Sequence, residues 1–244
     1  MRQGIIDMAV GSTINWSPQV QELNLFSMPF LMPDYKAIDA LTGGEVGKKL
    51  FDIIASKDIV PLAWGENGFR ELTNSKRAVR TPDDLKGLKV RVVGSPFTAL
   101  GANPTQMSWA DAQPALSTGA VDGQENPLTN IASSKLFEVN KFISLSGHKW
   151  ESSPFLMSQI TWTRLSPADK EIIKTAAKEA GDLQRKLFAE NEAKFNAQFR
   201  ADPKLAVNEV DKPAFREASS KVVDTWRAKP FGPFVDQLVK AAKV

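Results

Sequence analysis

Apolar and polar positions along this chain form runs with two different spacings. Apolar runs of four to six residues predict buried strands, and apolar residues that recur every three or four positions predict helices. The expected strands cover 5–10, 59–64, 88–93 and 120–123, and the expected helices cover 35–41, 45–56, 81–87, 110–118, 166–200, 212–228 and 233–243. Because strands alternate with helices over much of the chain, the pattern predicts an α/β fold built on parallel sheets.

Capping and helix-breaking residues support several of these boundaries. Asp34 precedes the helix expected from residue 35, and Thr81-Pro82 combines an N-cap with a proline at the first helical position. The apolar stretch 28–33 contains two prolines and therefore predicts an irregular loop. We also expect a loop over 11–18 and a turn at 65–68, where glycines flank Glu-Asn.

The longest helical pattern, over 166–200, predicts a helix long enough to lie across two small lobes of a protein. At about 1.5 Å per residue, a helix over 166–200 is about 50 Å long, which exceeds the width of one small lobe. Residues 2–7 and 117–122 share the order helix end, Gly, two apolar residues and Asp. This match favours two similar lobes, although so short a pattern also arises by chance.

The first residues have the character of a helix end. Gly4 stands where a C-cap glycine is expected, and three residues precede it. We therefore expect that a helix, and a strand before it, are missing, and that the chain is a fragment or a truncated product. The start also lacks the basic and apolar run of a secretory signal, so export would require that a signal has been removed.

Composition excludes several classes of function. The 31 Lys and Arg and 28 Asp and Glu give a net charge of +3, and they are spread along the chain in mixed runs, which does not favour nucleic acid as a partner. A slight positive balance suits an anionic small ligand, but an ordinary solubilising surface is the commoner reason for such a charge, so the net charge decides nothing. The absence of cysteine excludes disulfides, thiolate nucleophiles and cysteine metal sites. No apolar run reaches the roughly 18 residues of a membrane helix.

Catalytic motifs are also missing. His148 is the single histidine, and its Gly-His-Lys setting predicts a surface position. The sequence has no Gly-x-Ser-x-Gly elbow, no Walker loop and no Gly-x-Gly-x-x-Gly, so it predicts no catalytic residue and no cofactor. Asp83 and Asp84 follow a helix start, where carboxylates act as caps. With one histidine and no cysteine, we expect no metal site.

Arg91 is the residue that most favours a binding function. It interrupts the apolar strand 88–93 near its carboxyl end, where the ligands of open α/β sheets bind. A planar guanidinium can hold a carboxylate through two parallel hydrogen bonds, which an ammonium cannot. From the residues alone, an arginine on a solvated strand face remains an alternative. Arg70, Trp109 and Asn126 have similar alternatives as surface, core and turn residues.

Four segments carry a resemblance to a known family. They are Asn67-Gly-Phe-Arg-Glu-Leu-Thr-Asn74, Asp84-Leu-Lys-Gly-Leu-Lys-Val-Arg-Val92, Ala99-Leu-Gly-Ala-Asn-Pro-Thr105 and Gly119-Ala-Val-Asp-Gly-Gln-Glu-Asn-Pro127. Their order and spacing resemble the solute-binding proteins of tripartite ATP-independent periplasmic (TRAP) transporters, of the C4-dicarboxylate-binding DctP family. The resemblance runs from about residue 4 to the C-terminal helices.

The resemblance implies a periplasmic receptor that binds an organic acid and delivers it to the membrane permease subunits of the transporter. It implies a two-lobed periplasmic-binding-protein-like fold with hinge strands, braced by the helix over about 166–200. Lobe I would comprise 1–67 and about 152–191, and lobe II 68–151 and about 192–244. No cofactor, metal or nucleic acid is implied.

The resemblance also implies roles for five residues. Arg91 matches the arginine that forms a salt bridge with the ligand carboxylate, and Arg70 matches a second polar contact, which we expect to keep some solvent. Trp109 matches an aromatic lid residue, Asn126 matches an amide that hydrogen-bonds the ligand, and Ser12 stands where a polar contact from the first lobe is common.

Two departures from the family pattern affect this interpretation. The family begins with a β-α-β segment of roughly sixty residues that this chain lacks, so one wall of the site would be missing. The segment 94–100 is about five residues short and leaves too little chain for a full crossover helix. Two other functions stay open: an α/β enzyme acting on an organic acid, and a sensory or degenerate binding module that has lost transport. Which acid binds also stays open.

Overall fold

The computed structural model describes residues 1–92 and 100–241. Its strands are β1 Met8–Val10, β2 Ile59–Ala63, β3 Glu66–Phe69, β4 Glu71–Asn74, β5 Lys89–Val92, β6 Asn103–Gln106, β7 Gly123–Asn126, β8 Phe142–Leu145, β9 Trp150–Ser152, β10 Phe155–Ser158 and β11 Ala206–Glu209. Its α-helices are α1 Thr13–Trp16, α2 Tyr35–Gly43, α3 Glu45–Ala55, α4 Trp109–Thr118, α5 Leu128–Ser133, α6 Gln159–Arg164, α7 Pro167–Ala201, α8 Lys212–Ser219, α9 Lys221–Arg227 and α10 Gly232–Ala241. Shorter 3-10 helices are η1 Gln21–Ser27, η2 Pro82–Leu85 and η4 Leu136–Glu138. The short segment 94–100, apart from its last residue, lies outside the described residues.

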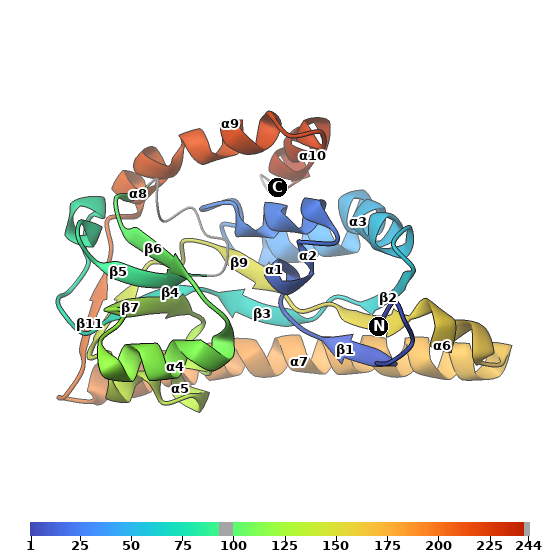
Figure 1. Cartoon of the computed structure of the whole chain (residues 1–244), viewed down its shortest axis with the longest axis horizontal. Helices are drawn as coiled ribbons and strands as arrows, with labels where there is room; N and C mark the ends of the chain where they lie inside the picture. The colour runs from blue at the N-terminus through green and yellow to red at the C-terminus, as the bar shows by residue number, and fades with distance from the viewer. Residues whose placement is uncertain (93–99, 242–244) are drawn as a thin grey trace.

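The strands form two sheets joined by a ribbon (Figure 1). The smaller sheet has the order β1-β10-β2, the larger has the order β11-β8-β4-β7-β5-β6, and β3 pairs with β9. The expected parallel pairing holds for β5 with β6 and β7, and for β11 with β8. It is wrong for β4, which pairs antiparallel with both β7 and β8 in the larger sheet. It is also wrong for the smaller sheet, because β10 returns from the ribbon and pairs antiparallel with both β1 and β2.

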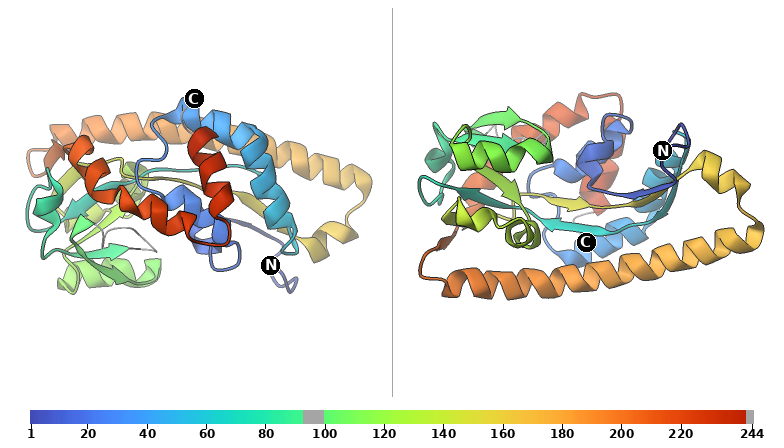
Figure 2. Two further views of the ribbon diagram at one scale, coloured as in Figure 1. Left: turned by 90° about the horizontal axis from the view of Figure 1, so that it is seen from above. Right: turned by 60° about the horizontal axis from the view of Figure 1, so that its bottom comes forward.

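The predicted long helix is confirmed as α7, within one residue at each end. Ser166 caps it by accepting a hydrogen bond from the backbone of Asp169 at 3.1 Å, and Pro167 occupies the first turn. The helix contacts β2, β3, α5 and β11, so it touches both sheets and the ribbon, and it runs along the length of the molecule (Figure 2). At Gly181 an added Cβ would lie 2.9 Å from the carbonyl oxygen of Trp64, so a glycine is needed for this close approach.

The core consists of separate apolar clusters. The one around α2 and α3 includes Val235 and Leu238, which come from the last helix, α10. The other two lie against the larger sheet, around Val90 and around Ile143. The division into two lobes at the expected boundaries stays a prediction, but this packing favours grouping α10 with the first lobe.

Several local expectations were wrong. The strand expected at 120–123 begins at Gly123, because Gly119 ends α4 with φ +73° and the next residues form a turn. The helix expected over 212–228 is divided at Ser220 into α8 and α9. The expected turn at 65–68 is instead part of strand β3, in which Gly68 has φ +109° at a shift of register.

Other expectations were confirmed or stay open. The two-proline stretch 28–33 is irregular, as expected, while the loop at 11–18 contains the short helix α1. Gly4 has φ +73°, the conformation of a C-cap glycine, and the expectation that a helix and strand precede it stays a prediction. Within 1–92 and 100–241, no helix has the length and apolar character needed to cross a membrane.

Candidate functional site

A cavity of about 240 Å³ brings the five predicted site residues together. Ser12 reaches it from the loop after β1, Arg70 from between β3 and β4, Arg91 from β5, Trp109 from the first turn of α4 and Asn126 from the end of β7. The sequence interpretation missed other lining residues: Gly11, Ile14, Asn15, Asn67, Asn130 and Ser153. The sequence predicts a turn at Asn67, so no pattern indicates that this residue lies on a buried strand beside the cavity.

Arg91 is held by its own strand and by a backbone carbonyl. The strand β5 lies between β6 and β7, and the residue is 2% exposed. Its Nε and Nη2 donate to the carbonyl oxygen of Met107 at 3.2 and 3.0 Å. These bonds use the side-on edge of the guanidinium and leave the end-on pair of N–H groups on Nη1 and Nη2 without a protein acceptor in the described chain.

The charge of Arg91 has no carboxylate partner within ion-pair distance among the described residues. Burial lowers its pKa, although an arginine stays protonated under such a shift. The ring of Trp109, which is 44% exposed, lies 5.4 Å from its guanidinium carbon and covers it from one side. Arg91 is therefore a fixed cation with donors still available for an anion.

Arg70 differs from the sequence expectation. It is 4% exposed, so the expectation that it keeps some solvent is wrong. Its Nε and Nη2 bind the side chain of Glu125, Nη2 also donates to the Glu125 carbonyl oxygen at 2.6 Å, and Nη1 lies 3.4 Å from Glu151 Oε2. Burial favours the neutral form, but both carboxylates raise the pKa of Arg70. Its charge is thus largely neutralised inside the protein.

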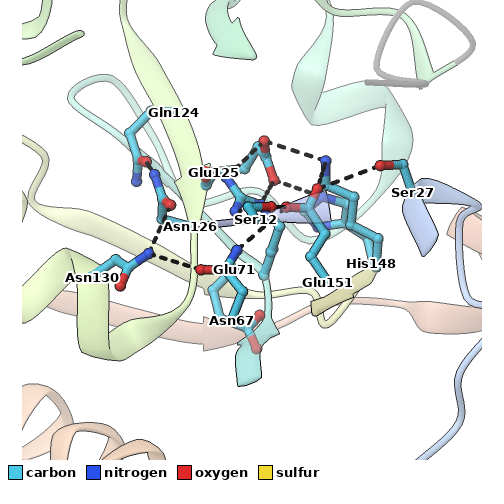
Figure 3. A network of polar contacts seen from close by, with 12 residues as sticks. Ser12, Ser27, Asn67, Glu71, Gln124, Glu125, Asn126, Asn130, His148 and Glu151 are labelled. Carbon is cyan, nitrogen blue, oxygen red and sulfur yellow. Dashed lines mark hydrogen bonds and ion pairs between the residues drawn. The ribbon is translucent and has the colours of Figure 1, made fainter. Parts of the chain in front are cut away.

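The carboxylates behind Arg70 form a buried ionic cluster that the sequence interpretation missed (Figure 3). Lys149 Nζ lies 2.8 Å from Glu151 and 3.6 Å from Glu125, and neither glutamate side chain is exposed. Burial alone would raise the pKa of each glutamate, but Arg70 and Lys149 hold both values below the usual one. Both acids are therefore ionised at neutral pH.

His148 belongs to the same cluster, so its expected surface position is wrong. It is 1% exposed, its Nδ1 lies 2.8 Å from Ser146 Oγ, and its Nε2 lies 3.4 Å from Glu125 Oε2. The backbone N–H of Phe30 donates to its carbonyl oxygen at 2.7 Å, so the apolar loop 28–33 lies beside His148. Burial lowers the pKa of His148, which keeps the ring neutral near pH 7.

Hydroxyl and amide groups complete the cavity wall. Ser12 Oγ donates to Glu151, and Asn67 Nδ2 donates to the same carboxylate at 3.3 Å. Asn126 donates to Gln124 and accepts from Asn130 Nδ2 at 3.3 Å, as Figure 3 shows. These bonds fix the orientation of the side chains before any ligand enters. The cavity therefore combines one available cation with preoriented neutral polar groups.

A larger cavity of about 350 Å³ lies apart from these residues. It is lined by Tyr35, Phe69, Glu71, Glu192 and Lys212, among others, and by none of the five predicted residues. No buried arginine is among the described residues that line this larger cavity. No group of carboxylates and histidine suited to a metal ion occurs within the described parts of the chain. The smaller cavity around Arg91 is therefore the better candidate.

Comparisons with known proteins show which family the chain is similar to. A family model described as "DctP: Bacterial extracellular solute-binding protein, family 7" matches residues 1–229. A TRAP periplasmic solute binding protein from Ralstonia eutropha H16, solved with bound (S)-2-acetolactate, is 51% identical, with a TM-score of 0.95 over 99% of this chain and 81% of that chain.

The chain spans only part of the length of two curated relatives. The uncharacterized protein y4mM of Sinorhizobium fredii is 46% identical over 93% of this chain but only 43% of that protein. The 2,3-diketo-L-gulonate-binding periplasmic protein YiaO of Escherichia coli is 35% identical over 89% of this chain and 68% of that protein. The chain thus spans less than half of the first and about two thirds of the second.

Proposed function

Since this chain belongs to the DctP family of bacterial extracellular solute-binding proteins, family 7, we propose that its cavity binds a small organic acid by the carboxylate, with Arg91 as the central contact. Members of this family bind solutes and do not convert them, so the enzyme alternative is excluded. Membership also assigns the protein to the periplasm.

The observation that carries the proposal is the state of Arg91. Its guanidinium is buried and held at one edge by Met107, and no carboxylate of the described chain neutralises it. A buried cation without a counter-ion is costly, and a bidentate carboxylate from a ligand would remove that cost. The solved relative from Ralstonia eutropha contains (S)-2-acetolactate, which carries one carboxylate.

The other four predicted residues have supporting roles in the proposal. Trp109 covers the guanidinium and the bound carboxylate, while Ser12, after β1, and Asn126, at the end of β7, offer hydrogen bonds to the ligand. Arg70 shapes the wall and acts on the ligand mainly through its position, because its charge is already paired. A ligand that touches both the β1 side and the β7 side would favour closure of the two sides around it.

Delivery to a TRAP membrane permease is the second part of the proposal. The alternative is a binding module that has lost transport, and the two differ in one measurable way. A transporting receptor should stimulate uptake of its acid into vesicles that contain the permease subunits. Binding without any stimulated uptake would favour the alternative.

The test of the binding site is a calorimetric titration of Arg91 variants with the acid that binds best in a screen of carboxylates. We expect Arg91→Lys to weaken binding strongly, because an ammonium keeps the charge but loses the end-on fork. Arg91→Ala should cost about 2–5 kcal/mol of binding free energy, the range for removing one partner of a desolvated charge pair.

Arg77 provides a matched control. Its guanidinium also donates to backbone carbonyls, those of Asp84 and Lys86, but it lies on the surface away from the cavity. Arg77→Lys should leave affinity unchanged. If Arg91→Lys binds within about threefold of the unmodified protein, a difference of roughly 0.7 kcal/mol, Arg91 is not the carboxylate contact.

A further inference from the structure

The wall behind the cavity is electrically balanced. Two cations, Arg70 and Lys149, face two carboxylates, Glu125 and Glu151, and each carboxylate lies within ion-pair distance of both cations. His148 completes the group, and burial keeps it neutral near pH 7. The cluster therefore adds no net charge to the cavity.

Glu151 occupies the key position in this balance. Its side chain is fully buried and contacts both cations, at 3.4 Å for Arg70 and 2.8 Å for Lys149. It also accepts hydrogen bonds from Ser12 and Asn67, which line the cavity, and from Ser27. Glu151 itself is absent from the cavity lining, so it acts through residues that touch a ligand.

Arg70 and Arg91 are the charged residues that line the cavity. Because the cluster neutralises Arg70, the excess positive charge of the described cavity is that of Arg91 alone. One ligand carboxylate matches this excess. A second carboxylate would be buried without a counter-ion, and such burial is strongly unfavourable unless the group is protonated or stays in water.

The remaining polar lining suits neutral groups of a ligand. It consists of hydroxyl and amide side chains: Ser12, Asn15, Asn67, Asn126, Asn130 and Ser153. Amides and hydroxyls offer both donors and acceptors, so they can bind hydroxyl and oxo groups of an acid as well as they bind one another. They cannot compensate a full negative charge as a cation does.

Building on the function proposed above, we propose that the site selects acids with one carboxylate and neutral hydroxyl or oxo groups over dicarboxylates, and that Glu151 sets this preference. Glu151 is then a specificity-determining residue that does not touch the ligand. It cancels cationic charge that would otherwise hold a second carboxylate.

The test uses pairs of acids that differ only in one terminal group. Erythronate ends in a hydroxymethyl group where meso-tartrate has a second carboxylate. Glycerate with tartronate, and galactonate with galactarate, are equivalent pairs of other chain lengths. In calorimetric titrations at pH 7.5, we expect the monocarboxylate to bind at least about tenfold more tightly in each pair that binds. Equal or tighter binding of the dicarboxylates would overturn the inference and leave the proposed function intact.

Glu151→Gln tests the assigned residue, because it removes the charge with little change of shape. We expect the ratio of monocarboxylate to dicarboxylate affinity to fall by about tenfold or more. Glu179→Gln, on the exposed face of α7, changes the net charge equally and should leave the ratio unchanged. An unchanged ratio in folded Glu151→Gln would overturn the role of Glu151.

A second variant covers the case in which Glu151→Gln does not fold. Asn15 lines the cavity from an exposed position, so Asn15→Lys adds a cation without disturbing the cluster. Asn15→Lys should raise the affinity for the dicarboxylate relative to the monocarboxylate in each pair. An unchanged ratio of the two affinities would contradict the inference that the positive charge of the cavity decides the preference. If the unmodified protein binds no acid of either kind, the proposed function fails and this inference fails with it.

Discussion

Two pairs of buried glutamates lie on neighbouring strands and have opposite electrostatic surroundings. Glu125 and Glu151 each lie within ion-pair distance of two cations. Glu66 has one distant cation, Arg185 at 3.9 Å, and Glu71 has none within that range among the described residues. All four are buried. Burial is therefore common to both pairs, and the partners differ.

The pKa values of the four glutamates depend on whether a cation lies beside the carboxylate. Burial raises the pKa of Glu66 to about 8 and that of Glu71 to about 7, although Trp150 Nε1 donates to Glu66 and the backbone of Gly147 donates to Glu71 at 2.7 Å. For Glu125 and Glu151 the same burial is outweighed by Arg70 and Lys149. Neutral hydrogen-bond donors thus do not replace cations as partners of a buried carboxylate.

The largest effect that would sharpen this contrast is expected for Glu125→Gln. The substitution leaves Arg70 and Lys149 with one carboxylate instead of two, so we expect a loss of about 3–5 kcal/mol in the free energy of unfolding. Urea denaturation at pH 7.5 measures it. The same substitution at Glu66 should not destabilise the protein at this pH, and a similar loss in both variants would remove the distinction between the pairs.

The dependence of stability on pH gives the second contrast. A carboxyl whose pKa rises on folding stabilises the folded state fully below its unfolded value of 4.5, and this contribution is lost as pH rises through the folded value, about 8 for Glu66. Because of Glu66, the free energy of unfolding should fall as pH rises from 4.5 to 8, with a slope of at most about 1.4 kcal/mol per pH unit. Glu125 and Glu151 act oppositely, because their contribution is present above 4.5 and is lost as pH falls below it.

Unfolding free energies at pH 5, 6.5 and 8 separate these contributions. We expect Glu66→Gln to flatten the decline between pH 5 and 8, since glutamine does not titrate. A decline of the same slope in this variant would show that Glu66 is already ionised in the folded protein.

The smallest expected effect belongs to Glu71→Gln. The folded pKa of Glu71 is about 7, so its contribution is lost over the narrower window from pH 4.5 to 7. A glutamine oxygen can still accept the hydrogen bond from Gly147, so little is lost at pH 5. The variant should equal the unmodified protein at pH 5 and exceed it in stability at pH 8. A variant that is less stable at pH 8 would indicate that Lys212 pairs with Glu71 in solution.

The local sequence determined those features that depend on neighbours in the chain. The spacing of apolar residues predicted α7 within one residue, and Asp34 and Thr81 cap the helices that follow them, as expected. Arg91 could be selected because it interrupts an apolar strand near its carboxyl end, where the ligands of open α/β sheets bind, and because it matches an arginine of the family. The resemblance to a family then selected Ser12, Trp109 and Asn126, which line the same cavity as Arg91.

Only the tertiary structure decided which charges neutralise each other. Arg70 meets Glu125 across 55 positions of sequence, and Ser12 meets Glu151 across 139. No periodicity reports such contacts, because helix and strand patterns describe one face of one element. Arg70 and Arg91 look alike in sequence, yet the charge of Arg70 is paired and that of Arg91 is available. His148, expected at the surface, is buried beside the loop 28–33. The electrostatic free energy of a buried charge depends on groups within a few ångströms, and folding alone brings those groups together.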